Sequence, residues 1–160
     1  MAGELVNLVV RVNQAIRSEK VLRTAVVTVL SEHKPRIFEQ GLDENNGKIG
    51  TYSTRPISIA RSRQARDTGR TRFPGGYSEY KKAVGKNPGF VTLRDTDQMM
   101  HDYGIVDRGS GQLGLGFNNS HNYEKSQWLM DKYGKNIFFH SQREVDTLGK
   151  VLEAELSKQI

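Results

Sequence analysis

The residues that decide the fold stand near the C-terminal end of the chain, SQREVDTLGKVLEAEL at positions 141–156. Ser141 followed by Glu144 forms a capping box, a pattern that starts a helix by satisfying its free backbone N–H groups. Apolar residues then recur with helical spacing, at Val145, Leu148, Leu152 and Leu156. Because such a stripe must be covered, the sequence predicts a C-terminal amphipathic helix packed on a sheet.

The segments before and beside this helix predict a small antiparallel sheet and a second helix. Asn119 or Ser120 caps a helix that runs through Tyr133 and stops at Gly134. Short strands are predicted at Phe90 to Leu93, Gln112 to Phe117, and Ile137 to Phe139.

Gly109, Gly111 and Gly114 match the pattern G-x-G-x-x-G. In a dinucleotide-binding fold this pattern needs a helix after it, and here a strand is predicted instead. The glycines therefore predict a hairpin turn.

Helical spacing returns in the N-terminal part of the chain. Leu5 to Ile16 and Leu22 to Leu30 predict two helical segments, and Pro35 is expected to limit any continuation. Further on, the sequence predicts a turn at Asp43 to Gly47, short strands at Ile49 to Thr51 and Ile57 to Ile59, and a short helix from Ser78 to Val84.

A basic tract, Thr51 to Gly76, follows the N-terminal elements. The tract contains six arginines and one acid, Asp67, so it contributes +5 of the net charge of +6. The arginines are Arg55, Arg61, Arg63, Arg66, Arg70 and Arg72. Guanidinium groups bind carboxylates and phosphates with paired hydrogen bonds, so we expect an extended loop that docks on a partner subunit or on nucleic acid. The other interpretation is a solvated, mobile loop.

Tyr77 and Tyr80 lie on one side of the short helix after this tract. We expect them to anchor the foot of the loop, and we add them to the six arginines as candidate partner-binding residues.

Together these elements predict one α+β domain over residues 1–160. It has an N-terminal helical arm, a small antiparallel sheet with a long arginine-rich loop at 51–76, and a C-terminal helix on the sheet. The hydrophobic content of 36% is low, which favours either exposed polar loops or a core completed by neighbouring chains.

Composition also excludes several kinds of site. Without cysteine there is no thiol nucleophile and no thiolate ligand, and the four dispersed histidines predict no metal site and no cofactor. The first residues do not form a signal peptide, and no apolar run approaches the length of a membrane span.

Asp95, Asp97 and Asp102 beside His101 are the nearest approach to an acid–base cluster. Asp95 or Asp97 more simply caps a predicted helix from Thr96 to Tyr103, so we predict no enzyme and no catalytic residues.

Aromatic residues near the predicted strands and helices offer stacking surfaces for bases if they line a basic groove. They are Tyr103, Phe117, Tyr123 and Trp128. Trp128 stands beside Leu129 and Met130 on a predicted helix, so we expect it to pack in the core.

The order of these features resembles the tail-completion or neck proteins of tailed bacteriophages, also described as virion morphogenesis proteins. The C-terminal motifs are Leu113-Gly-Leu-Gly-Phe117, Tyr123 to Leu129, Lys132-Tyr-Gly134, Ile137-Phe-Phe139 and the closing amphipathic helix. The central motifs are Ile37-Phe38 with Gly41, Ile49-Gly50-x-Tyr52-Ser53, Gly76-Tyr77-x-x-Tyr80-Lys81 and Val91-x-Leu93-x-x-Thr96. The resemblance covers most of residues 20 to 157.

The resemblance implies an α+β structural subunit of a closed ring between portal and tail, commonly of six or twelve copies, without catalytic residues. Its partners would be copies of itself and neighbouring portal, neck or tail proteins, in the virion after assembly in the host cytoplasm. A ring subunit needs two different interfaces, which suits arginine-rich loops and a low apolar content. Whether the tract faces packaged DNA or an adjacent ring stays open.

Two alternatives remain. In the first, the protein is a small nucleic-acid-binding module in which Arg55 to Arg72 follows phosphates. In the second, less favoured, it is a small hydrolase that uses Asp95, Asp97 and His101.

Overall fold

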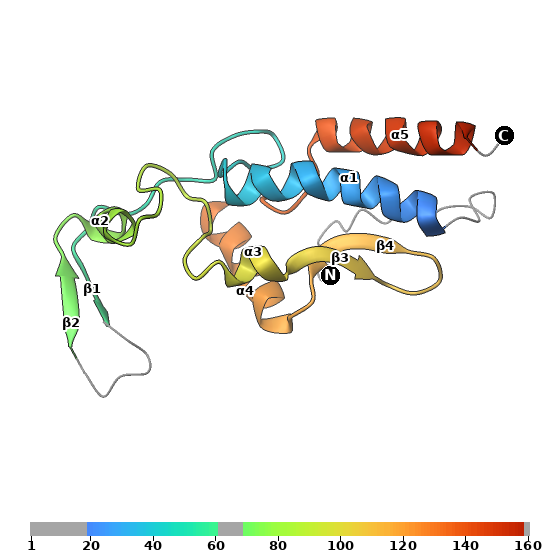
Figure 1. Cartoon of the computed structure of the whole chain (residues 1–160). Coiled ribbons are helices and arrows are strands. Elements are labelled where there is room, and N and C mark those ends of the chain that lie inside the picture. The colour runs from blue at the N-terminus through green and yellow to red at the C-terminus, as the bar shows by residue number, and fades with distance from the viewer. Residues whose placement is uncertain (1–18, 61–68, 159–160) are drawn as a thin grey trace.

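The computed structural model describes residues 19–60 and 69–158, which form the predicted α+β fold (Figure 1). The described elements are α1 (Glu19–Phe38), β1 (Ile57–Ala60), β2 (Arg70–Phe73), α2 (Gly76–Ala83), α3 (Gln98–Asp102), β3 (Tyr103–Asp107), β4 (Leu113–Phe117), α4 (Ser120–Tyr133) and α5 (Gln142–Ser157). The strands pair as two antiparallel hairpins, β1 with β2 and β3 with β4. The helix predicted at Leu5 to Ile16 lies outside the described residues.

Helix α1 occupies the centre of the fold, between α5 on one side and the β3–β4 hairpin on the other (Figure 1). Ala25, Val26 and Val29 of α1 are fully buried in one core with side chains from β4 and α5. The prediction that the C-terminal helix lies on the sheet is therefore wrong, because α1 covers the sheet and α5 packs on α1. Leu148 is the best-buried residue of the predicted α5 stripe.

Pro35 lies inside α1 and does not end it, contrary to expectation. Proline removes one helical hydrogen bond, but the last turn contains Arg36, Ile37 and Phe38, all of which are buried. Burial of that turn against the rest of the core offsets the cost of the proline.

Several elements with strong local signals are confirmed. The Asn119 side chain accepts a hydrogen bond from the His121 N–H at the start of α4, which ends at Gly134. Ser141 and Glu144 form the reciprocal capping box of α5. Gly109 and Gly111 have φ of +73° and +74° in the turn between β3 and β4, so the glycine pattern is a hairpin turn as predicted.

Three predicted strands are absent from the described residues, and two strands, β2 and β3, were missed. Ile49, Val91, Ile137 and Phe138 are buried apolar residues of irregular segments, because a short apolar run can enter a core without pairing. Strand β3 begins at Tyr103, where a helix was expected to end, and Tyr103 stands opposite Phe117 of β4.

The described residues 51–60 and 69–90, here called the hairpin arm, extend away from the rest of the described residues, here called the body (Figure 1). The arm contains β1, β2 and α2, so the prediction of one extended loop over 51–76 is wrong in part. Its short helix and the glycine turn before it were predicted. None of its described side chains joins the fully buried apolar core.

No helix in the described ranges is long and apolar enough to span a membrane.

Candidate functional site

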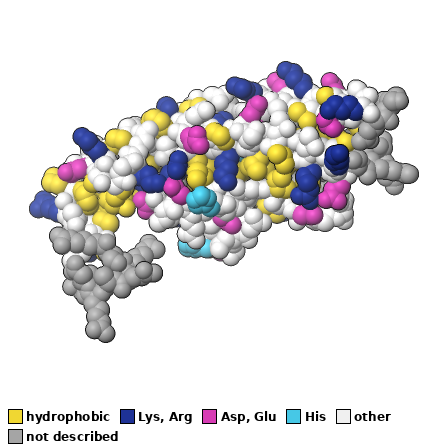
Figure 2. Space-filling model, viewed as in Figure 1, with side chains coloured by type: hydrophobic (Ala, Val, Ile, Leu, Met, Phe, Trp, Pro, Cys, Tyr) yellow, Lys and Arg dark blue, Asp and Glu magenta, His cyan; other side chains and the backbone are white. Residues whose placement is uncertain are grey.

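A groove of about 880 Å³ lies where the hairpin arm meets the body. One wall is the segment Thr51 to Arg55, a second is the face of α2 that carries Tyr77 and Lys81, and a third is helix α4. Gly76 lets α2 start against this segment, since a Cβ there would lie 2.5 Å from the carbonyl oxygens of Ser53 and Arg55. Hydrophobic side chains and Lys or Arg side chains appear together at the arm end of the molecule (Figure 2).

The α4 wall combines aromatic and basic side chains with helical spacing. Lys125, Trp128, Lys132 and Tyr133 follow i, i+3, i+7 and i+8 and so share one face of the helix. Trp128 is 56% exposed, so the expectation that it packs in the core is wrong. The Lys132 Nζ lies 4.7 Å from the centre of the Trp128 ring and 5.5 Å from that of Tyr133.

The α2 wall is built around Lys81, which is only 2% exposed. Its Nζ donates hydrogen bonds to the Arg94 carbonyl oxygen at 2.6 Å and to Asp95 Oδ1 at 3.0 Å. The rings of Tyr52, Tyr77 and Tyr80 surround this ammonium group at 5.6, 5.1 and 5.9 Å. Lys81 therefore joins the arm to the body and neutralises the acid of the groove.

Burial also raises the pKa of Tyr77, with a further contribution from the charge of Asp95. Its phenol therefore stays protonated and neutral inside the groove wall.

Three exposed cations of the groove, Arg55, Lys125 and Lys132, have no acidic partner within the described ranges. Asp95, the acid that lines the groove, is already paired with Lys81. The groove thus presents positive charge beside aromatic and apolar surface. That chemistry suits an anionic ligand that also carries apolar groups.

The candidate partner-binding residues fall into separate groups. Arg55 and Tyr77 line the groove, and Tyr80 stands behind it with its ring 5.5 Å from that of Phe73. Arg70 and Arg72 are exposed on the face of the β1–β2 hairpin opposite to Ile57 and Phe73. Arg61, Arg63 and Arg66 lie outside the described residues.

The acids near His101, considered above as the nearest approach to an acid–base cluster, are engaged in separate contacts. Asp97 makes no side-chain cap; its carboxylate instead accepts hydrogen bonds from Arg94 Nε at 2.8 Å and Lys86 Nζ at 2.7 Å. These hydrogen bonds lower the pKa of Asp97, in spite of its partial burial. Lys81 and Lys86 belong to the arm, so their ion pairs with Asp95 and Asp97 connect the arm to the body.

Asp102, the third acid of that cluster, is engaged elsewhere. Its carboxylate accepts hydrogen bonds from the backbone of Asn119 and from the side chain of Asn122. It therefore supports the start of α4.

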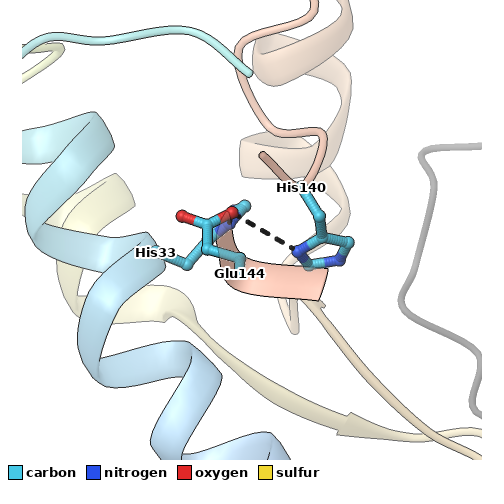
Figure 3. A group of neighbouring side chains, drawn as sticks. All are labelled: His33, His140 and Glu144. Atoms are coloured by element: carbon cyan, nitrogen blue, oxygen red, sulfur yellow. Dashed lines mark hydrogen bonds and ion pairs between the residues drawn. The ribbon is translucent and has the colours of Figure 1, made fainter. Parts of the chain in front are cut away.

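The fold brings together a second polar group that the sequence did not reveal. His33 of α1, His140 before α5 and Glu144 of α5 point toward one another inside the molecule (Figure 3). One ligand atom from each lies within 4.8 Å of the others. His140 and Glu144 are four residues apart, but His33 precedes Glu144 by 111 residues, so nothing in the sequence indicated that the three would meet.

Arg36 supplies the positive charge of this buried cluster. Its Nε donates to Glu144 Oε1 at 2.7 Å, and its Nη2 donates to the Phe139 carbonyl oxygen at 2.6 Å. His33 bonds to Glu144 through Nδ1 at 2.9 Å and to the Tyr103 hydroxyl through Nε2 at 2.8 Å. A neutral His33 with its proton on Nδ1 satisfies both contacts.

The protonation states follow from burial and from Arg36. Burial lowers the pKa of His33, and it lowers that of His140 to about 4. Burial by itself would raise the pKa of Glu144, but hydrogen bonds from His33 and Arg36 and the charge of Arg36 lower it. The cluster is a carboxylate balanced by a guanidinium, which leaves no excess negative charge for a divalent metal ion.

Comparisons with family models, with curated proteins and with solved structures find no match for this chain.

Proposed function

We propose that this chain is a structural subunit of a phage head-to-tail connector or tail-completion ring. The proposal starts from the resemblance of the chain to tail-completion and neck proteins. In this role the protein surrounds the DNA channel with copies of itself and joins portal or neck proteins to the tail. It has no catalytic task.

The observation that carries the proposal is the hairpin arm, which projects from the body without a core of its own. An isolated two-stranded hairpin is marginally stable in water. Ile57, Ile59 and Phe73 on one face of this hairpin are half-buried, and Arg70 and Arg72 on the other face are exposed. A neighbouring subunit that covers either face would supply the missing burial.

The arginines of the arm suit that contact. In the described part of the chain no ion pair involves Arg55, Arg70 or Arg72, and the Arg70 guanidinium reaches the Ser58 carbonyl oxygen at 3.3 Å. Such groups are available for acidic side chains or carbonyl oxygens of adjacent subunits. A heterologous contact of this kind closes into a ring when the rotation between subunits allows it.

Particle size tests the proposal. The wild-type chain should sediment as a closed multimer, and negative-stain images should show rings. A variant with Arg55, Arg70 and Arg72 changed to Ser should remain a folded monomer. A matched variant with Arg23, Arg108 and Arg143 changed to Ser, exposed arginines of the body, should still form rings. A wild-type chain that stays monomeric at every concentration contradicts the proposal.

One feature favours the nucleic-acid alternative. Arg70 and Arg72 lie two residues apart on the exposed face of a two-stranded ribbon, and a ribbon of this kind fits the major groove of DNA. If the arm binds DNA directly, affinity for free duplex should fall steeply as salt rises. Little affinity at low salt would exclude this alternative.

A further inference from the structure

One side of the groove between the hairpin arm and α4 is main chain in which several N–H and C=O groups have no hydrogen-bond partner within the described residues. In the described part of the chain, the backbone groups of Thr51, Tyr52 and Thr54 make no hydrogen bonds, and the segment belongs to no helix or strand. The Ser53 carbonyl oxygen is occupied by the Ser78 N–H, which fixes the segment against α2. A segment with free backbone donors and acceptors offers partners with which an extended chain can pair.

The opposite wall supplies charge and an anchoring surface. Lys125 and Lys132 project from α4 on either side of the exposed Trp128, and Arg55 ends the main-chain segment. Tryptophan, tyrosine and arginine are the residue types that dominate binding energy at protein interfaces. An occupant that matches this wall needs carboxylates along one face and apolar side chains beside them.

We propose that the groove binds an extended acidic segment of a neighbouring connector protein, which pairs its main chain with Thr51 to Arg55 and directs its carboxylates to Lys125, Lys132 and Arg55. The identity of the partner as a connector protein rests on the proposed function. The described ranges of this chain offer no such segment, because their acidic residues belong to helices, strand β3 and short turns or bends.

The free backbone groups distinguish this occupant from single-stranded nucleic acid. A nucleic-acid strand would use the cations and stack a base on Trp128, but it has no repeating N–H and C=O groups to pair with a protein backbone. A peptide uses the cations, the aromatic surface and the free backbone groups together. The free backbone groups thus favour a peptide.

The probe is a blocked peptide of about ten residues in which Glu alternates with Val or Thr, so that every carboxylate lies on one face of the extended chain. Trp128 is the only tryptophan of the chain, and its fluorescence reports binding in the groove directly. The peptide should produce a saturable change in that fluorescence. The same peptide with Gln in place of Glu should bind about tenfold more weakly or worse.

Two further comparisons separate the parts of the proposal. Changing Lys125 and Lys132 to Gln should weaken binding about tenfold, whereas the matched change of Lys20 and Lys150, exposed on α1 and α5, should leave it unaltered. Methylating alternate peptide nitrogens of the probe should also weaken binding about tenfold, because it removes the donors that pair with the main-chain segment.

Three results would overturn the inference: equal binding of the Glu and Gln peptides, equal weakening by the two lysine pairs, or no effect of peptide methylation. Tighter binding of a single-stranded oligothymidine than of the acidic peptide, lost on changing Lys125 and Lys132, would replace it with a nucleic-acid site. Peptide binding without ring formation would refute the proposed ring but not the proposed binding of a peptide in the groove. Ring formation without peptide binding would refute only the proposed binding of a peptide in the groove.

Discussion

The body and the hairpin arm are stabilised by different kinds of contact. In the body, α1 is buried between α5 and the β3–β4 hairpin, and a single apolar core connects all of these elements. The arm adds no fully buried apolar side chain to that core. The polar contacts that tie it to the body include Lys81 to Asp95, Lys86 to Asp97, and the Tyr52 hydroxyl to the backbone of Thr92.

This difference separates two roles within one chain. A body with a continuous apolar core is expected to unfold as one cooperative unit, whereas an arm linked by polar contacts can open without it. The surfaces proposed to recognise partners belong wholly or partly to the arm, where a partner would complete their burial. Each of the following changes tests whether the two parts respond separately.

The largest effect is expected in the body, from Glu144→Ala. Glu144 accepts hydrogen bonds from His33, Arg36 and the backbone of Ser141, and its loss would leave Arg36 as a buried charge without an acidic partner. The free energy of unfolding should fall by about 3 to 5 kcal/mol. Urea denaturation measures this, with Glu153→Ala on the exposed part of α5 as the control. A loss as small as that of the control would mean that the buried cluster does not hold α5 on α1.

Acid should destabilise the body next most strongly, through His140, which faces His33, Arg36 and Glu144. The pKa of His140 is about 4 in the folded chain against 6.5 as the reference value, so the unfolded chain takes up a proton first as pH falls. The free energy of unfolding is therefore highest above pH 6.5. Between pH 6.5 and pH 4 it falls by about 3 kcal/mol because of His140.

Thermal unfolding of wild type and His140→Phe across this pH range tests the assignment. The variant keeps an aromatic ring in place and should show a shallower decline. His121→Phe, at the exposed start of α4, should keep the wild-type slope. Parallel slopes for all three proteins would exclude His140 as a source of the acid sensitivity.

In the arm, Lys81→Met should act locally. The substitution removes the charged hydrogen bonds to Asp95 and the Arg94 carbonyl oxygen, and the free energy of opening the arm should fall by about 2 kcal/mol. Amide hydrogen exchange should accelerate over β2 and α2 while protection of α1 is retained. Accelerated exchange in α1 to the same degree would show that arm and body unfold together. Lys82→Met, at the exposed neighbouring position, is the matched control.

The smallest effect on folding is expected from the arginine face of the hairpin. Changing Arg70 and Arg72 to Ser should alter the free energy of unfolding by less than about 0.5 kcal/mol, because both side chains are exposed. Urea denaturation of the monomer measures this, and sedimentation of the same sample measures assembly. A large loss of folding stability would mean that these residues serve the chain itself.

Local signals in the sequence predicted elements well where a few neighbouring residues decide the outcome. The capping box of Ser141 and Glu144, the cap and stop of α4 at Asn119 and Gly134, and the glycine turn before β4 all form as predicted. In each case the deciding contacts are made within a few residues of the chain.

The candidate site was only partly predictable. Arg55 and Tyr77 were chosen for their positions in or beside the basic tract, and they do line the groove. Trp128 was assigned to the core, because helical spacing cannot show which side of α4 receives a neighbour. Lys81 was missed as an anchor, since a lysine is ordinarily exposed and its burial depends on Asp95 and three tyrosine rings.

The sequence by itself determined the α+β class, the caps and turns of the clearest elements, and the separate basic character of residues 51–76. Only the tertiary structure decided that α5 covers α1, that β3 exists, and that His33 meets Glu144 across 111 residues of chain. The physical reason is the range of the interactions. Caps and turns are fixed by neighbours in sequence, whereas packing depends on which faces exclude water together, and that choice is made by the whole fold.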